Sequence, residues 1–339
     1  MTQIIFIVSA FVLTYFGVGA FRRWTLRREI LDFPNERSSH TVPTPRGGGL
    51  VIVLICLLFY TIYAVFIARE FSYGYFAGAV LIAVVSWFDD LKSVSSALRF
   101  LVHAVGAALA IYSLGYWQKI YIPFAGEVDA GTIGALVTFF WIIWLTNAYN
   151  FMDGIDGIAG TQAFTAGIGW LLIGLFFQLE ITGFLGGVLA VSNLGFLMHN
   201  WQPARIFMGD VGSAFLGYTF AVIPLIASNE LRDNQSRLTM AAVLLVWMFV
   251  FDTLYTFFGR LLRGEKFWRA HRSHLYQRLV ISGYSHRFVT ILYGFLSFVI
   301  LASVLYWLGS GNGLDALPLF LVFAISGGII ILCYNKENS

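Results

Sequence analysis

The sequence predicts an all-α integral membrane protein, built as a polytopic bundle of about eleven transmembrane helices. Of its 339 residues, 58% are hydrophobic and only 12% are charged, whereas soluble domains carry about 25% charged residues. The mean hydropathy is +0.77, so the chain has too few charges to cover a water-facing exterior. Aromatic residues make up 17% of the chain, as expected where Trp and Tyr gather at many membrane–water boundaries.

The predicted spans follow from the length of the apolar stretches, since a helix needs roughly 20 apolar residues to cross the hydrocarbon core. The first stretch is predicted to be a retained span and not a signal peptide, because no basic segment precedes it and no small-residue cleavage site follows before Arg22. A bundle of ten spans is the alternative. Residues 1–339 are expected to form a single membrane-embedded domain. The stretches are about 1–21, 47–68, 71–88, 98–115, 131–149, 157–178, 181–199, 211–229, 238–259, 288–309 and 316–334.

Lys and Arg are distributed unevenly between the two sets of loops that such a bundle creates. Seventeen of the 21 fall in one set, and only Arg69, Lys119, Arg232 and Arg237 fall in the other. Loops on the cytoplasmic side of a membrane carry the excess of Lys and Arg. The basic set is therefore predicted to face the cytoplasm, with the N-terminus periplasmic and the C-terminus inside.

Five polar clusters interrupt the apolar pattern, and each lies at a helix end predicted to be cytoplasmic. The orientation comes from Lys and Arg alone, yet the acidic residues gather on the same face, which predicts one shared basin. The clusters are Pro34–Arg37 with Pro43–Gly49, Asp89-Asp90, Asn147–Gly157, Asn200–Ser213 and His271–His274.

The chemistry of this basin follows from its residue types. Several carboxylates beside many cations indicate a divalent metal ion that holds a phosphorylated substrate. Hard oxygen ligands suit Mg²⁺, which usually takes one or two protein ligands and shares the rest with phosphates and water. Arg side chains can supply bidentate phosphate contacts, and Gly-rich turns that enter helices offer backbone N–H groups to anions.

Each acidic cluster also has a purely structural alternative. Asp89 and Asp90 could end a solvated helix, although two adjacent carboxylates repel each other unless a cation intervenes. Asp210 could simply cap the helix that follows it. Asp153 and Asp156 lie in a Gly-rich turn, where Asp is common in any case.

Four other polar residues have different expected roles. His271 and His274 have the spacing of a metal pair on a helix, but Arg272 between them favours phosphate contact. His103 lies inside the fourth predicted span and is expected to form a hydrogen bond between helices. Asp252 lies inside the ninth, where a carboxylate is costly and often functional, and its role is left open.

These residues resemble the polyprenyl-phosphate N-acetylhexosamine-1-phosphate transferases, glycosyltransferase family 4. The resemblance runs from about Phe33 to Arg278, and its signatures are the Asp89-Asp90 pair, residues 147–157 (NAYNFMDGIDG) and residues 207–213 (FMGDVGS), in that order. Residues 269–278 (RAHRSHLYQR) look most like the branch that initiates O-antigen, because they lack the consecutive histidines of the peptidoglycan enzyme.

The resemblance implies a reaction in which a polyprenyl phosphate oxygen attacks the β-phosphorus of a UDP-N-acetylhexosamine and releases UMP. It implies Mg²⁺ as cofactor, with Mn²⁺ as the alternative. The implied partners are the UDP-sugar, undecaprenyl phosphate and the lipid bilayer; a homodimer is left open, and no nucleic acid is expected. The implied location is the bacterial inner membrane, with the active site facing the cytoplasm, and the implied product is the first lipid-linked sugar of an O-antigen or lipopolysaccharide type of polymer.

The resemblance also implies roles for individual positions. Asp89 is similar to a residue proposed to deprotonate the lipid phosphate or to act as nucleophile. A phosphate monoester has a second pKa of about 6, so the acceptor is already largely dianionic at neutral pH, which weakens the need for a base. The implied roles are metal ligation for Asp210 and Asn150; nucleotide contact for Asp153, Asp156, Phe207 and Asn200; phosphate contact for Arg99, His271, Arg272 and Arg46; and catalysis for Asp89 and Asp90.

Two alternatives remain at this point. Within the family, the alternative is phospho-MurNAc-pentapeptide transfer in peptidoglycan synthesis. In a different class, the alternative is a polytopic transporter. Transporter sites lie near the bilayer midplane, whereas these acids gather at one membrane interface.

Overall fold

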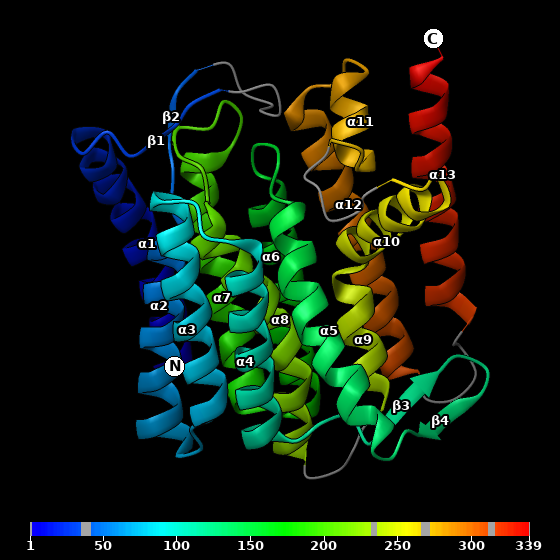
Figure 1. Cartoon of the computed structure of the whole chain (residues 1–339). Coiled ribbons are helices and arrows are strands. Elements are labelled where there is room, and N and C mark those ends of the chain that lie inside the picture. Colours follow the sequence, from blue (N-terminus) through cyan, green and yellow to red (C-terminus); the bar gives the residue numbers. More distant parts are fainter. Residues whose placement is uncertain (1, 35–41, 232–235, 266–271, 311–315, 339) are drawn as a thin grey trace.

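Helices run the length of one bundle, with short strands at its two ends (Figure 1). The computed structural model describes residues 2–34, 42–231, 236–265, 272–310 and 316–338. Within them, ten helices are long and apolar enough to cross a membrane. They are α1 (Thr2–Arg27), α2 (Gly49–Ile62) continued by the π-helical η1 (Tyr63–Ala68), α3 (Tyr73–Leu91), α4 (Ser96–Leu114), α5 (Ile133–Phe151), α6 (Ile158–Phe177), α7 (Glu180–Asn200), α8 (Asp210–Leu231), α12 (His286–Gly309) and α13 (Ala316–Glu337).

The ninth predicted span is broken in two. Its halves, α9 (Arg237–Leu245) and α10 (Trp247–Leu262), meet at an angle of 75°. A backbone carbonyl at such a break needs a partner, because hydrocarbon offers none. The side chain of Gln162 donates to the carbonyl of Leu245 over 2.8 Å, and Ser297 donates to the amide oxygen of Gln162 over 2.9 Å. The ten helices confirm the predicted polytopic bundle, and this pair makes an eleventh span if its two halves are counted as one.

One short helix and two pairs of short strands were not predicted from the hydropathy pattern. The short helix α11 (Leu275–Ile281) precedes α12. Strand β1 (Leu31–Asp32) pairs antiparallel with β2 (Thr44–Pro45) ahead of α2, and β3 (Lys119–Ile122) pairs antiparallel with β4 (Gly126–Asp129) between α4 and α5. The strands are too short for alternation of polar and apolar residues to reveal them.

The core is centred on α8, whose most apolar window is 94% buried, against 17% for α1 at the periphery. Small residues allow the helices to approach closely. Gly212 of α8 lies against Gly49 of α2, and Gly174 of α6 lies against Gly183 of α7, so closely that a Cβ on any of the four would press on its partner helix. The outer helices expose large apolar side chains such as Phe66, which suits contact with lipid.

The two ends of the bundle carry different loops. The turns after α1, α3, α5, α7 and α10 lie at one end, together with α11 and the C-terminal end of α13; we call this the site end (upper end in Figure 1). The turns after η1, α4, α6 and α8 lie at the other, which we call the far end, with β3 and β4. All described parts of the five polar clusters lie at the site end. The structure therefore groups the loops as the sequence predicted, while their cytoplasmic orientation stays a prediction.

Candidate active site

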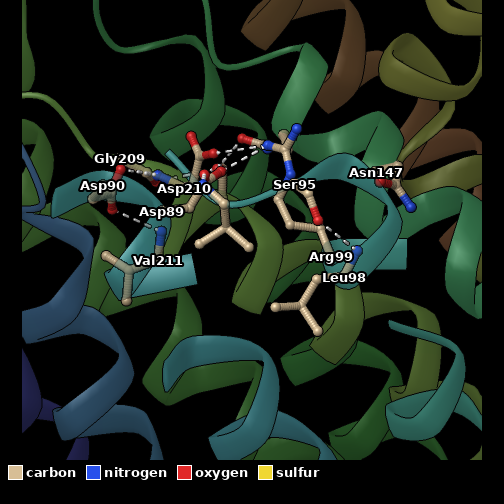
Figure 2. A network of polar contacts seen from close by, with 12 residues as sticks. Asp89, Asp90, Ser95, Leu98, Arg99, Asn147, Gly209, Asp210 and Val211 are labelled. Atoms are coloured by element: carbon tan, nitrogen blue, oxygen red, sulfur yellow. Dashed lines mark hydrogen bonds and ion pairs between the residues drawn. The ribbon is translucent and has the colours of Figure 1, made fainter. Parts of the chain in front are cut away.

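Three carboxylates and two guanidinium groups from four separate segments form one network at the site end. Figure 2 shows the part of it that Asp89, Asp90, Arg99 and Asp210 form. Asp89 and Asp90 lie in the last turn of α3, Arg99 lies in the first turn of α4, and Asp210 begins α8. Arg46 lies in the turn between β2 and α2. The network joins residues up to 164 positions apart in the chain, as the sequence predicted for a shared basin.

Arg46 bridges two of the carboxylates. Its Nε lies 2.7 Å from Asp90 Oδ1, and its Nη2 lies 2.7 Å from Asp210 Oδ1. Burial lowers the pKa of Arg46, but the two carboxylates outweigh burial and hold that pKa above its ordinary value. The guanidinium therefore stays charged, and it keeps the two acids together.

The loop that carries Arg46 is held by backbone pairing with the residues before α8. The carbonyl of Phe207 accepts from Gly48 N over 2.9 Å, and the amide of Phe207 donates to the carbonyl of Pro45 over 2.8 Å. A third bond joins Gly49 N to the carbonyl of Met208 over 2.9 Å. A Cβ on Gly48 would lie 3.1 Å from the Ile206 side chain, and one on Gly49 would lie 2.9 Å from the Met208 carbonyl, so side chains at these two glycines would press on the segment before α8.

Asp90 caps the start of α8. Its side chain is only 1% exposed, and it accepts from Asp210 N over 2.9 Å and from Val211 N over 3.0 Å. These are two of the amides that a helix leaves without partners at its N-terminus. Gly209 adopts a positive φ of 77° at this point, and a Cβ there would lie 2.6 Å from Asp90 Oδ2. Asp90 thus positions Asp210, while its predicted catalytic role stays a prediction.

Asp89 organises the turn between α3 and α4. Its Oδ1 accepts from Val94 N over 2.6 Å, and its Oδ2 lies 2.7 Å from Arg99 Nη1. The same nitrogen of Arg99 lies 3.4 Å from Asp210 Oδ2. Ser95 caps α4 by accepting from Leu98 N over 3.3 Å, which fixes the turn of helix that presents Arg99 (Figure 2). Asp210 therefore meets a guanidinium at each of its carboxylate oxygens.

Asn150 joins the end of α5 to the first turn of α8. Its amide oxygen accepts from the hydroxyl of Ser213 over 2.8 Å, and Ser213 lies three residues after Asp210. The nearby Asp153 lies in the α5–α6 turn. Burial raises the pKa of Asp153 well above its ordinary value, and negative charge on Asp210 and Asp90 adds to the effect. Asn150 and Asp153 thus belong to the same basin as Asp210.

Asp156 and Asn200 tie the α5–α6 turn to the segment between α7 and α8. Asp156 Oδ2 accepts from Ala204 N over 3.0 Å. Asn200 is 4% exposed; its amide oxygen accepts from Gly157 N and its nitrogen donates to the carbonyl of Ile206, each over 2.9 Å. This geometry gives Asn200 a positioning role. The nucleotide contacts predicted for both residues, and for the half-buried Phe207, stay predictions.

The last predicted cluster is described only in part. His271 lies outside the described residues. Arg272 is half-buried and precedes α11. Burial holds the pKa of the Tyr276 hydroxyl well above its usual value, and the charge of Arg272 lowers that pKa in part. The hydroxyl of Tyr276 donates to the carbonyl of Phe151 over 3.0 Å, which brings the last cluster against the α5–α6 turn.

The remaining predicted contact is confirmed, and two residues of the site were missed. His103 Nδ1 lies 3.0 Å from Asn147 Nδ2 between α4 and α5, which is the hydrogen bond between helices that was expected. Ser213 was missed as a partner of Asn150, although its place one helical turn after Asp210 could have indicated it. Tyr276 carries no local sequence signal for its long-range contact.

The chain is similar to several known proteins over most of its length. Residues 72–228 match glycosyl transferase family 4. A probable undecaprenyl-phosphate N-acetylglucosaminyl 1-phosphate transferase of Bacillus subtilis is 29% identical over 344 residues, which cover 95% of this chain and 90% of the relative. A decaprenyl-phosphate N-acetylglucosaminephosphotransferase of Mycobacterium leprae is 30% identical over 317 residues, which cover 84% of this chain and 78% of the relative. This chain belongs to glycosyl transferase family 4.

The family match extends to a second kind of relative. A phospho-N-acetylmuramoyl-pentapeptide-transferase of Listeria monocytogenes is 29% identical over 241 residues, which cover 65% of this chain and 74% of the relative. The sequence predicted a member of the polyprenyl-phosphate N-acetylhexosamine-1-phosphate transferases. The names of these relatives confirm that prediction.

The oxygen donors at the site suit the metal that this family resemblance implied. Asp210 offers carboxylate oxygens and Asn150 an amide oxygen, and Asn150 is bound to Ser213, which lies three residues after Asp210 in α8. Both are hard ligands of the kind that Mg²⁺ prefers. Among the described residues, no three or more His, Cys, Asp or Glu side chains form a metal-binding group.

Proposed function

We propose that the protein transfers N-acetylhexosamine-1-phosphate from a UDP-sugar to undecaprenyl phosphate, with release of UMP. One observation carries the proposal. Carboxylates of α3 and α8 converge with Arg46 and Arg99 at one end of a membrane bundle, in a chain whose relatives are named as transferases of this kind. Phosphoryl transfer asks a protein mainly for positioning and charge stabilisation, and this network can provide both.

The charges of the network favour a bound cation. Three carboxylates face two guanidinium groups, and a diphosphate would add further negative charge. We propose that Mg²⁺, or Mn²⁺ in its place, is held by Asp210 and Asn150. The ion would supply charge neutralisation at the transferred phosphoryl group. Arg46 and Arg99, which contact Asp210 here, would then be available to the diphosphate.

The contacts of the acidic pair suggest how they serve the reaction. Asp90 holds the start of α8 and thereby fixes Asp210. Asp89 holds Arg99, and a lipid phosphate that is already dianionic needs no strong base. We therefore assign Asp89 and Asp90 to electrostatic organisation of the site.

The membrane fold suits an acceptor that has an ionic head and a hydrocarbon tail. The bend at α10 turns this helix away from the direction of α9, and α10 exposes Phe258 and Leu262. An apolar helix surface close to the site end allows the tail to stay in lipid while the head meets a soluble donor. We propose that this end faces the cytoplasm, in a bacterial inner membrane.

We propose UDP-GlcNAc as the donor. The relatives named for N-acetylglucosamine transfer align with 84% and 95% of this chain, whereas the phospho-MurNAc-pentapeptide relative aligns with 65%. The polymer is proposed to be a cell-surface polysaccharide of the O-antigen or lipopolysaccharide type. The assignment of the polymer rests on residues 269–278 alone, since the names of the relatives mention no polymer.

The test is an assay with the purified protein in detergent, undecaprenyl phosphate, Mg²⁺ and a panel of UDP-sugars, with UMP release as readout. UMP release with UDP-GlcNAc that depends on the lipid and stops with EDTA is the expected result. Preference for UDP-MurNAc-pentapeptide would assign the protein to the peptidoglycan branch. Uptake of a solute by proteoliposomes without UMP release would favour a transporter.

Orientation needs a separate measurement. A Cys introduced at Ser95 at the site end should react with a membrane-impermeant maleimide only from the cytoplasmic side, and one at Phe124 at the far end only from outside. The native Cys56 and Cys333 are buried, which keeps the background low. The reverse pattern would overturn the cytoplasmic assignment.

A further inference from the structure

Asp252 is an acid to which the proposed reaction gives no role. It lies in α10 and is 0% exposed. A buried carboxylate is costly unless hydrogen bonds or opposite charges compensate for the lost water. The partners of Asp252 therefore show what it does.

Most of those partners lie at the start of α11; the others are the hydroxyls of Tyr293 and of Thr256, the latter 3.3 Å from Oδ1. Asp252 Oδ1 accepts from Leu275 N over 2.9 Å and lies 3.1 Å from His274 Nδ1, and Oδ2 accepts from Tyr276 N over 3.0 Å. The hydroxyl of Tyr293, in α12, donates to Oδ2 over 2.8 Å. Asp252 therefore caps α11 from a different helix, as Asp90 caps α8.

Tyr276 carries the connection onward to the α5–α6 turn. Its hydroxyl donates to the carbonyl of Phe151 over 3.0 Å, the residue directly after Asn150. Gly154 packs against the same hydroxyl so closely that a Cβ would collide with it. The contact thus joins α11 to the turn that holds Asn150 and Asp153.

Arg272 is connected to the same cap through the backbone. Only Ser273 and His274 separate it from Leu275, whose amide is bound to Asp252. One buried carboxylate, Asp252, therefore holds both sides of the basin. One side is Arg272, the candidate for phosphate contact, and the other is the α5–α6 turn.

We propose that Asp252 is a positioning residue for donor binding. By capping α11 it holds Arg272 on one side and, through Tyr276, the α5–α6 turn on the other, in one fixed arrangement. The inference rests on the proposed function, because a UDP-sugar diphosphate is the group that both segments would meet.

The test compares Asp252→Asn with Tyr276→Phe. Each variant is expected to raise the KM for UDP-GlcNAc about 10-fold, the equivalent of one hydrogen bond to a charged or positioned group, while kcat changes less than about 3-fold. Because both act through one connection, the double variant should raise KM by less than the product of the single effects. Calorimetric binding of UDP gives the same comparison without turnover.

Two matched controls lie at or toward the far end. Glu230 also caps a helix from another element, accepting from Ile181 N over 2.6 Å and Thr182 N over 2.8 Å. Tyr218 also places a buried hydroxyl 3.2 Å from a carbonyl of another helix, that of Gly106. Glu230→Gln and Tyr218→Phe should leave the KM for UDP-GlcNAc unchanged, even where they lower thermal stability in detergent.

Each outcome decides one claim. An unchanged KM and unchanged UDP binding in folded Tyr276→Phe would overturn the inference, and so would a KM increase of the same size in the two controls. Independent, fully multiplicative effects in the double variant would show that the two residues do not share a connection. If Asp252→Asn fails to fold, Tyr276→Phe decides alone. If the wild-type protein releases no UMP from any donor, the proposed function fails, and UDP binding still tests the positioning role.

Discussion

The two ends of the bundle use the same structural devices for different results. At both ends a carboxylate caps a helix from another element: Asp90 and Asp252 at the site end, Glu230 at the far end. At the far end charges find partners locally, as Lys119 does with Glu127 across one hairpin, at 3.4 Å. At the site end Asp210 draws Arg46 and Arg99 from two other elements.

The difference shows which charges serve function. A local ion pair on an exposed hairpin contributes little stability and can be lost without consequence elsewhere. Bringing three carboxylates into one place costs free energy, because they repel one another. Such an arrangement is expected where a bound cation and a charged substrate interact with it. Substitutions of the same kind at the two ends should therefore differ sharply in their effect on turnover.

The largest effect is expected for Asp210→Ala. Loss of the metal-ligand candidate removes the charge stabilisation of the transferred phosphoryl group, so kcat should fall by about 1,000-fold or more. The protein should still insert and purify, since α8 keeps its cap from Asp90. UMP release is the measurement. Asp129→Ala at the far end, where Asp129 accepts from Gly131 N over 2.8 Å, is the control. Turnover near that of wild type at saturating Mg²⁺ would remove the metal assignment.

A smaller but still large effect is expected for Arg46→Lys. The guanidinium reaches Asp90 and Asp210 with two different nitrogens, and an ammonium group cannot reproduce that fork. We expect kcat/KM to fall about 100-fold. The matched change is Arg237→Lys at the far end, where the guanidinium lies 5.6 Å from the ring centres of Tyr121 and Trp307; kcat/KM should not change there. Equal losses at both ends would break the comparison.

Asp156→Ala should act on donor affinity. Its carboxylate holds Ala204 N and so fixes the segment that leads to Phe207. We expect the KM for UDP-GlcNAc to rise about 10-fold with a smaller change in kcat, the loss of one charge-assisted hydrogen bond. Initial rates at varied donor concentration measure it. An unchanged KM would mean that neither Asp156 nor the segment it holds contacts the nucleotide.

The sequence was sufficient for the spans and for the grouping of the acids. Apolar stretches reveal membrane helices because their length is set by the bilayer, and the uneven placement of Lys and Arg separates the two ends. The break at Val246 was not predictable, since the stretch from 238 to 259 has neither Pro nor Gly before the bend. The partner of the carbonyl at the bend comes from another helix, in the bond from Gln162 to Leu245, and no local sequence signal announces it.

Within the site, the residue types were predictable and their division of labour was not. Adjacent carboxylates at the end of α3 indicated function, but only the backbone geometry shows that Asp90 binds amides of α8 while Asp89 binds Arg99. The role of Asp252 was likewise hidden, because its partners other than Thr256 lie 22 to 41 residues away along the chain.

The smallest effect is expected from two single glycine substitutions, one near the site and one toward the far end. Their comparison distinguishes an effect on stability from an effect on turnover. Gly49→Ala would press on Gly212 where α2 crosses α8, and Gly174→Ala would press on Gly183 where α6 meets α7 toward the far end. Each should lower stability by about 1–3 kcal/mol, the usual cost of overpacking, measured as thermal denaturation in detergent. Only Gly49→Ala should also lower kcat, because the backbone bond from Gly49 N to Met208 holds the loop of Arg46 beside Asp210. If Gly174→Ala, at equal loss of stability, lowered kcat as much, the activity loss would follow general destabilisation of the bundle and not displacement of Arg46.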